Sequence, residues 1–154
     1  MCRRRLDLGF LIDGSGSIEA YGRGNFRRCL NFVKRVVASF RISPRQTRVG
    51  VVLFSSRAWL VFNFRRYQNK QSMLRAVDKI RYPRGGTRTG RALRFARHQL
   101  FNKKSSRRKV CFNFRDVLEL YVLLSPSMSV PPNRSLMIVV TCQIGLLCVT
   151  GLLG

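Results

Sequence analysis

Two short loops carry the residue types of this chain that could hold an ion. The first is the run Asp-Gly-Ser-Gly-Ser at residues 13–17, which directly follows an apolar segment. Its glycines permit a tight turn, so a carboxylate and two hydroxyls at alternate positions can point to one place. Hard oxygen ligands of this kind suit Mg²⁺, which prefers octahedral oxygen coordination. The loop therefore predicts a divalent-cation site that includes Asp13, Ser15 and Ser17.

The second loop is the run Gly-Gly-Thr-Arg-Thr-Gly at residues 85–90, which precedes a helical segment and offers Thr87 as a further hydroxyl. Ordinary turn and helix-cap chemistry is the alternative explanation for both loops, because Ser, Thr, Asp and Gly favour such places in any protein. The order of the strands and helices around the two loops helps to decide between a cation site and ordinary turn chemistry.

Hydrophobic periodicity predicts alternating strands and helices over the first hundred residues. The run 6–13 ends in an acid and reads as a buried strand, and Asn69 is placed to cap the second of three helices. This order favours an α/β layer fold with a mostly parallel sheet. The predicted strands cover 6–13, 49–54 and 58–64, the last at a sheet edge, and the predicted helices cover 26–40, 71–80 and 91–101.

The two loops, with the strands between them in the right order, resemble the von Willebrand factor type A domain and its metal-ion-dependent adhesion site (MIDAS). Residues 6–101 resemble the matrilin and collagen-VI-like branch of that family. The resemblance implies a Rossmann-like open, mostly parallel sheet flanked by helices, with the site at the carboxyl ends of the strands. It also implies Mg²⁺ or Mn²⁺ held by Ser15 and Ser17 directly and by Thr87 directly or through water. Asp13 would act largely through water.

The function implied by the resemblance is non-enzymatic adhesion, in which a ligand's carboxylate completes the coordination of the cation. Extracellular matrix proteins such as collagens are the implied partners, and secretion as part of a larger protein is the implied setting. We expect no signal peptide in this chain, because Asp7 and Asp13 interrupt the apolar run after the basic start. Enzyme activity has no support: the single histidine, His98, has no acid or nucleophile at a catalytic spacing.

The chain departs from the family pattern after its first two thirds. The family places an acid after its next central strand, whereas here the strand candidate 136–141 is followed by Cys142 and Gln143. We therefore divide the chain into a domain at 6–109 and an atypical, irregular tail at 110–154, with one further strand at 136–141. Residues 111–136 also stand where the family would need very few residues. An atypical transcript, with foreign sequence inserted near residue 111 and altered reading after Thr141, would explain both these extra residues and the missing acid. A truncated, non-functional product is an alternative.

Residues 136–154 contain no charge over 19 positions, which is long enough to cross a bilayer. The segment also has β-branched residues and a glutamine near its middle. We favour a buried strand with an apolar tail over a membrane span.

Charge is the most unusual property of the composition. Thirty Lys and Arg stand against six Asp and Glu, which gives a net charge of +24. Such a balance makes polyanions plausible partners, with a sulfated glycan ahead of specific nucleic-acid recognition because no motif for base readout is present. A solvated helical face is the plainer explanation. If the chain were a polyanion-binding module, its metal site would be vestigial. The residues that could form the polyanion surface are Arg84, Arg88, Arg91, Arg94, Arg97, Lys103, Lys104, Arg107, Arg108 and Lys109.

Five cysteines leave one unpaired in any pairing scheme, and the chain has no C-x-x-C motif. The absence of this motif and the single histidine argue against a zinc finger or a catalytic zinc site.

Overall fold

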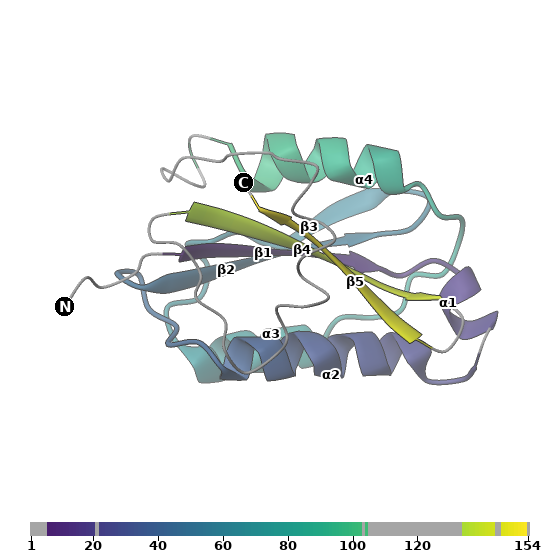
Figure 1. The fold of residues 1–154 in the computed structure, drawn as a ribbon, viewed down its shortest axis with the longest axis horizontal. Helices are drawn as coiled ribbons and strands as arrows, with labels where there is room; N and C mark the ends of the chain where they lie inside the picture. The colour runs from purple at the N-terminus through teal and green to yellow at the C-terminus, as the bar shows by residue number, and fades with distance from the viewer. Residues whose placement is uncertain (1–5, 21, 103, 105–133, 144–145, 154) are drawn as a thin grey trace.

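The protein is built on one five-stranded sheet (Figure 1). The computed structural model describes residues 6–20, 22–102, 104, 134–143 and 146–153. Strand β1 lies at the centre and pairs in parallel with β2 on one side and β4 on the other, while β3 and β5 form antiparallel edges. In sequence the strands are β1 (Leu6–Asp13), β2 (Thr47–Phe54), β3 (Ala58–Phe62), β4 (Arg134–Gln143) and β5 (Leu146–Leu153).

Helices cover both faces of the sheet (Figure 1). Helices α2 (Asn25–Ala38) and α3 (Lys70–Asp78) lie on one face, and α4 (Thr89–Phe95) lies on the other and continues into the π-helix η1 (Ala96–Leu100). The short helix α1 (Ser17–Ala20) lies at the end of the sheet where β1 ends. The result is the three-layer α/β arrangement that the sequence predicts.

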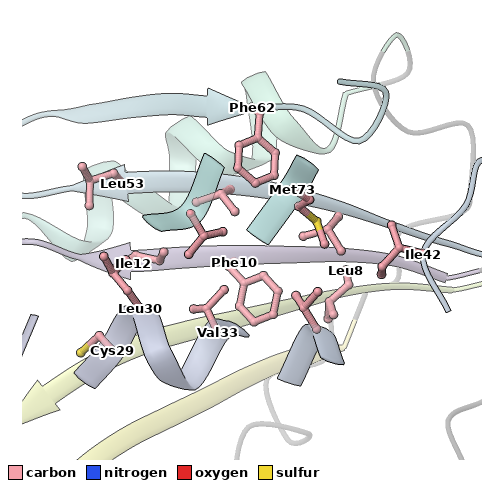
Figure 2. Packing of buried hydrophobic residues seen from close by; sticks show 14 of the residues in the cluster. Leu8, Phe10, Ile12, Cys29, Leu30, Val33, Ile42, Leu53, Phe62 and Met73 are labelled. Carbon is pink, nitrogen blue, oxygen red and sulfur yellow. The ribbon is translucent and has the colours of Figure 1, made fainter. Parts of the chain in front are cut away.

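The alternation of side chains along β1 explains the two layers of core. Leu8, Phe10 and Ile12 point towards α2 and α3, where Figure 2 shows them beside Val33 of α2 and Met73 of α3. Leu11 points the other way and packs in the cluster that α4 and η1 cover. All eight residues of β1 are buried, as expected for a central parallel strand with both faces covered.

Two paired glycines let η1 approach the sheet closely. Gly9 of β1 and Gly50 of β2 lie side by side in the register of the two strands. A Cβ atom at Gly9 would collide with Phe101, and one at Gly50 would collide with Leu100. The absence of side chains at these two positions therefore makes room for the end of the helix.

The order strand, helix, strand, strand, helix, loop, helix is confirmed, and so is the cap of α3: the Asn69 side chain accepts a hydrogen bond from the N–H of Ser72 at 2.9 Å. The third predicted helix begins two residues early, at Thr89, and becomes π-helical at Ala96. The loop before this helix sets where the helix starts, and hydrophobic periodicity alone does not locate that start.

The strand predicted at 136–141 is present and longer, as β4. The structure differs from the irregular, apolar tail that we expected after it, because residues 146–153 form β5 and pair with β4 along its length. An uncharged segment next to a strand edge gains backbone hydrogen bonds by pairing with it. The rest of the predicted tail, residues 110–133, lies outside the described residues. No helix in the described ranges is long and apolar enough to cross a membrane.

A buried ion pair ties β1 to β2 at the amino ends of the two strands. The guanidinium of Arg48 donates two hydrogen bonds to the carboxylate of Asp7, at 2.7 and 2.5 Å, and the two residues are register partners. Asp7 is fully buried, and Arg48 also lies over the ring of Phe64. Removing one partner of such a pair leaves an uncompensated charge in the interior.

We predict that Arg48→Met lowers the free energy of unfolding by about 3–5 kcal/mol, because the Asp7 carboxylate stays buried without the guanidinium of Arg48. Urea unfolding followed by circular dichroism measures the change. Arg45→Met, which removes an exposed arginine from the preceding loop, is the control and should change stability little. Equal losses in the two variants would contradict the structural role of the ion pair.

Candidate metal site

The candidate site begins in the turn that follows β1. The Asp13 carboxylate accepts a hydrogen bond from the N–H of Ser15 at 2.8 Å, and the N–H of Gly14 donates to the carbonyl of Phe54 at 2.7 Å. The first bond closes the turn and the second attaches it to the end of β2. Asp13 and Ser15 are both buried, so the turn is held inside the protein.

Three hydroxyls form a continuous chain from this turn to the second loop. Ser15 Oγ lies 2.9 Å from Ser17 Oγ, which lies 3.3 Å from Thr87 Oγ1, although Ser17 and Thr87 are 70 positions apart in sequence. Ser15 is buried, whereas Ser17 and Thr87 are exposed. The structure thus brings together all four residues predicted for the cation, with Asp13 at the base and an opening to solvent at Ser17 and Thr87.

Backbone hydrogen bonds hold the second loop against the first. The N–H of Gly16 donates to the carbonyl of Gly85 at 2.8 Å, where Gly85 adopts a positive φ of 100°. The residues that follow β2 contribute as well: the N–H of Gly86 donates to Ser56 Oγ at 2.7 Å, and the N–H of Arg88 donates to the carbonyl of Ser55 at 3.1 Å. The position of Thr87 is therefore set by the ends of β1 and β2 together.

Sequence reasoning missed two residues that support the site. The Tyr82 hydroxyl donates a hydrogen bond to the carbonyl of Ser15 at 2.7 Å, and its ring stacks on Phe26. Burial raises the pKa of Tyr82 above its ordinary value. Glu19 accepts the N–H groups of Gly24 and Phe26 and so caps α2. No spacing rule would have assigned either role.

The donor set fits a hard, six-coordinate cation. Metal–oxygen bonds of about 2.1 Å at right angles place neighbouring oxygens about 3.0 Å apart. The two hydroxyl separations, 2.9 and 3.3 Å, are close to that length. No group of three or more His, Cys, Asp or Glu side chains gathers in the part of the chain that the structure describes, so a soft or histidine-rich site is absent from that part.

The charge of the donor set is low. Asp13 supplies one carboxylate, and its burial raises the pKa of that carboxyl above the ordinary value of 3.8, while hydrogen bonds from Ser15 oppose the shift. The acid that the family resemblance implies after this strand is not found at that position: β4 runs beside β1, with Val140 opposite Ile12, and its last residues are Thr141, Cys142 and Gln143. The site therefore combines a complete set of hydroxyls with a single negative charge.

The structure describes some of the residues predicted for a polyanion surface. Arg84 has a positive φ of 58°, and its guanidinium lies over the ring of Tyr82 at 5.8 Å from the centroid. His98, which sequence reasoning left without a chemical role, is exposed on η1. Also exposed are Arg84, Arg88, Arg91, Arg94, Arg97 and Lys104, whereas Lys103, Arg107, Arg108 and Lys109 lie outside the described residues.

Comparison with known proteins decides the family. The family model for the von Willebrand factor type A domain matches residues 7–127, which is most of the chain. The chain belongs to this family. Human vitrin is 41% identical over 116 residues, which cover 75% of this chain and 17% of vitrin. The human collagen alpha-6(VI) chain is 39% identical over 101 residues, which cover 66% of this chain and 4% of the collagen.

Solved structures of this von Willebrand factor type A fold agree. Proximal thread matrix protein 1 from the mussel byssus, solved with a zinc-occupied MIDAS motif, is 32% identical with a TM-score of 0.63, over 71% of this chain and 28% of that one. The manganese-loaded TRAP protein of Plasmodium vivax is 25% identical with a TM-score of 0.57, over 68% of this chain and 42% of that one. The present chain thus spans less than a fifth of the curated relatives named above and less than half of these structures.

We predict that Asp13→Asn is more stable than the wild type in EDTA at neutral pH, because the ionised carboxylate is buried at a cost that the amide avoids. The raised pKa means that the folded wild type loses stability as pH rises from 3.8 through that pKa. The advantage of the variant should therefore shrink on acidification towards pH 3.8. Urea unfolding at a series of pH values measures the difference in stability between Asp13→Asn and the wild type. A difference that does not depend on pH would contradict the raised pKa of Asp13.

Proposed function

We propose that this von Willebrand factor type A domain is a non-enzymatic adhesion module that binds Mg²⁺ or Mn²⁺ and, through it, a carboxylate of a protein ligand. Ser15 and Ser17 bind the cation directly, Thr87 binds it directly or through water, and Asp13 acts largely through water. The single observation that carries the proposal is the chain of three hydroxyls that joins two distant loops at octahedral spacing above a buried carboxylate.

Each residue of the site has a distinct role in the proposed binding of the cation. Asp13 fixes the Ser15 backbone and supplies the negative charge beneath the cation, while Tyr82 holds the Ser15 carbonyl from the other side. Ser17 and Thr87, both exposed, leave the solvent side free for a ligand. When bound, the cation supplies a positive centre that an incoming carboxylate can coordinate. A donor set with one carboxylate leaves that centre positive, which favours an anionic ligand.

Matrix proteins such as collagens are the partner class that we propose, with an extracellular setting as part of a longer protein. The proposal rests on the family and on the kind of protein that carries similar domains: the matches include a collagen chain and a thread matrix protein.

We predict that millimolar Mn²⁺ or Mg²⁺ raises the melting temperature relative to EDTA, because a ligand that binds only the folded state stabilises it. At ten times the dissociation constant the gain is about 1.4 kcal/mol, or about 5 °C for a domain of this size. Ser15→Ala should abolish the shift, since it removes the hydroxyl at the base of the site. Ser39→Ala, which removes a hydroxyl at the end of α2, is the control and should keep it.

Differential scanning calorimetry distinguishes the alternatives in the same experiment. A cooperative transition that ignores metal in the wild type would contradict the proposed metal site and leave a folded module of another function. The absence of any cooperative transition would instead support a truncated product that does not fold.

We also predict that Cys142→Asp strengthens Mn²⁺ binding by about tenfold or more, because cation affinity at oxygen sites rises with the number of charged ligands. Residue 142 stands where the family places its acid, at the carboxyl end of the strand beside β1. Isothermal titration with Mn²⁺ measures the change, and Cys142→Asn serves as the uncharged control. Equal affinities of the two variants would show that β4 does not reach the cation.

A further inference from the structure

Helix α4 and the residues that flank it contain no acidic side chain. Of the acidic side chains in the described residues, one binds Arg48 in the interior, one closes the turn of the candidate metal site, one caps α2, and one binds Lys34 at 2.6 Å on the α2–α3 face. In that order they are Asp7, Asp13, Glu19 and Asp78. The sequence then contains no acid from residue 79 to residue 115. Helix α4 and its flanks therefore have no carboxylate of their own segment to offset their arginines.

Exposed arginines recur at every third position along this segment. Arg88 precedes α4, and Arg91 and Arg94 lie within it, all three exposed. Positions three apart on a helix are neighbours, about 5–6 Å between Cβ atoms, so like charges there destabilise the helix. Ala92 and Ala96 form the buried side, which keeps the helix close to the sheet and leaves the arginines outside. A bound polyanion would remove this repulsion.

We propose that Arg88, Arg91 and Arg94 form a binding surface for the sulfate groups of a sulfated glycan. The guanidinium group is a planar fork that donates two parallel hydrogen bonds to an oxyanion, and 24 of the 30 basic residues of the chain are arginine. Arg97, three positions after Arg94 in η1, is exposed as well, whereas Arg84 lies over the ring of Tyr82, which stacks on Phe26 of α2.

The character of the surface distinguishes a glycan from other polyanions. Binding of single-stranded nucleic acid uses exposed aromatic rings on which bases stack, but the only aromatic residue within α4, Phe95, is partly buried against the core. Attachment to a membrane surface uses large apolar side chains that enter the bilayer, whereas the exposed large apolar side chains in the described ranges are Trp59, Leu60 and Val61 on β3. The exposed side chains of α4 itself, Arg91 and Arg94, offer charge and hydrogen bonds.

This surface begins directly beside the candidate metal site, since Arg88 follows Thr87. The two sites nevertheless use different chemistry, because sulfate binding by arginine needs no cation. The proposal is therefore tested in EDTA, where a metal-dependent function is silent and its failure would not affect the result.

The test measures binding of the full chain to heparin in EDTA over a series of NaCl concentrations. The triple variant Arg88→Gln/Arg91→Gln/Arg94→Gln is expected to bind about tenfold or more weakly at physiological salt and to show a shallower salt dependence, because fewer counterions are released. The matched control, Arg35→Gln/Arg75→Gln/Lys79→Gln, removes the same charge from exposed positions on the α2–α3 side and should lose far less. Thermal unfolding of both variants verifies that they are folded.

Three outcomes would overturn the proposal. Equal losses in the two triple variants would show that net charge alone drives binding. Undiminished binding to desulfated heparin would exclude sulfate recognition. Stronger binding to single-stranded DNA, or to vesicles containing phosphatidylserine, than to heparin of equal charge would assign the surface to another class of partner.

Discussion

Strand β1 is the element on which the site depends. Its eight residues are buried, it pairs in parallel with a neighbour on each side, and helices cover both of its faces. A strand held in this way leaves its carboxyl end little freedom, and the turn that follows starts from a fixed position. Asp13, the last residue of the strand, then uses its carboxylate to hold the Ser15 N–H. This bond closes the turn that carries the hydroxyls of Ser15 and Ser17.

The second half of the site is attached through β2. The residues after that strand, Ser55 and Ser56, hold the loop that carries Thr87, and Gly16 binds the same loop from the first turn. Three segments far apart in sequence therefore converge at one edge of the sheet, where open α/β sheets bind their ligands. A buried carboxylate whose pKa is raised by burial is costly to ionise without a counterion. A cation above it would offset that cost, so the feature that destabilises the metal-free protein is also the one that would favour metal binding.

The sequence was enough to predict the layered α/β fold, and its resemblance to the family predicted the grouping of Asp13, Ser15, Ser17 and Thr87. Buried strands with helical stripes between them have few ways to pack, and parallel strands bring their carboxyl ends to one edge. It could not predict Tyr82 or Glu19, because their contacts depend on the path of loops and helix ends. It also did not predict β5, whose pairing with β4 follows from a neighbouring strand edge rather than from a pattern within the segment. The π-helical turn that begins at Ala96 ends where Leu100 and Phe101 lie close to Gly9 and Gly50, a contact that sequence periodicity does not encode.

The most direct test of the central claim is a crystal structure of the full chain grown with Mn²⁺, with the metal located by its anomalous scattering. The account predicts one anomalous peak within about 2.0–2.3 Å of the hydroxyl oxygens of Ser15 and Ser17, with Thr87 bound directly or through a water molecule. A map with no peak between the two loops at saturating Mn²⁺, or with manganese only at other carboxylates, would contradict it.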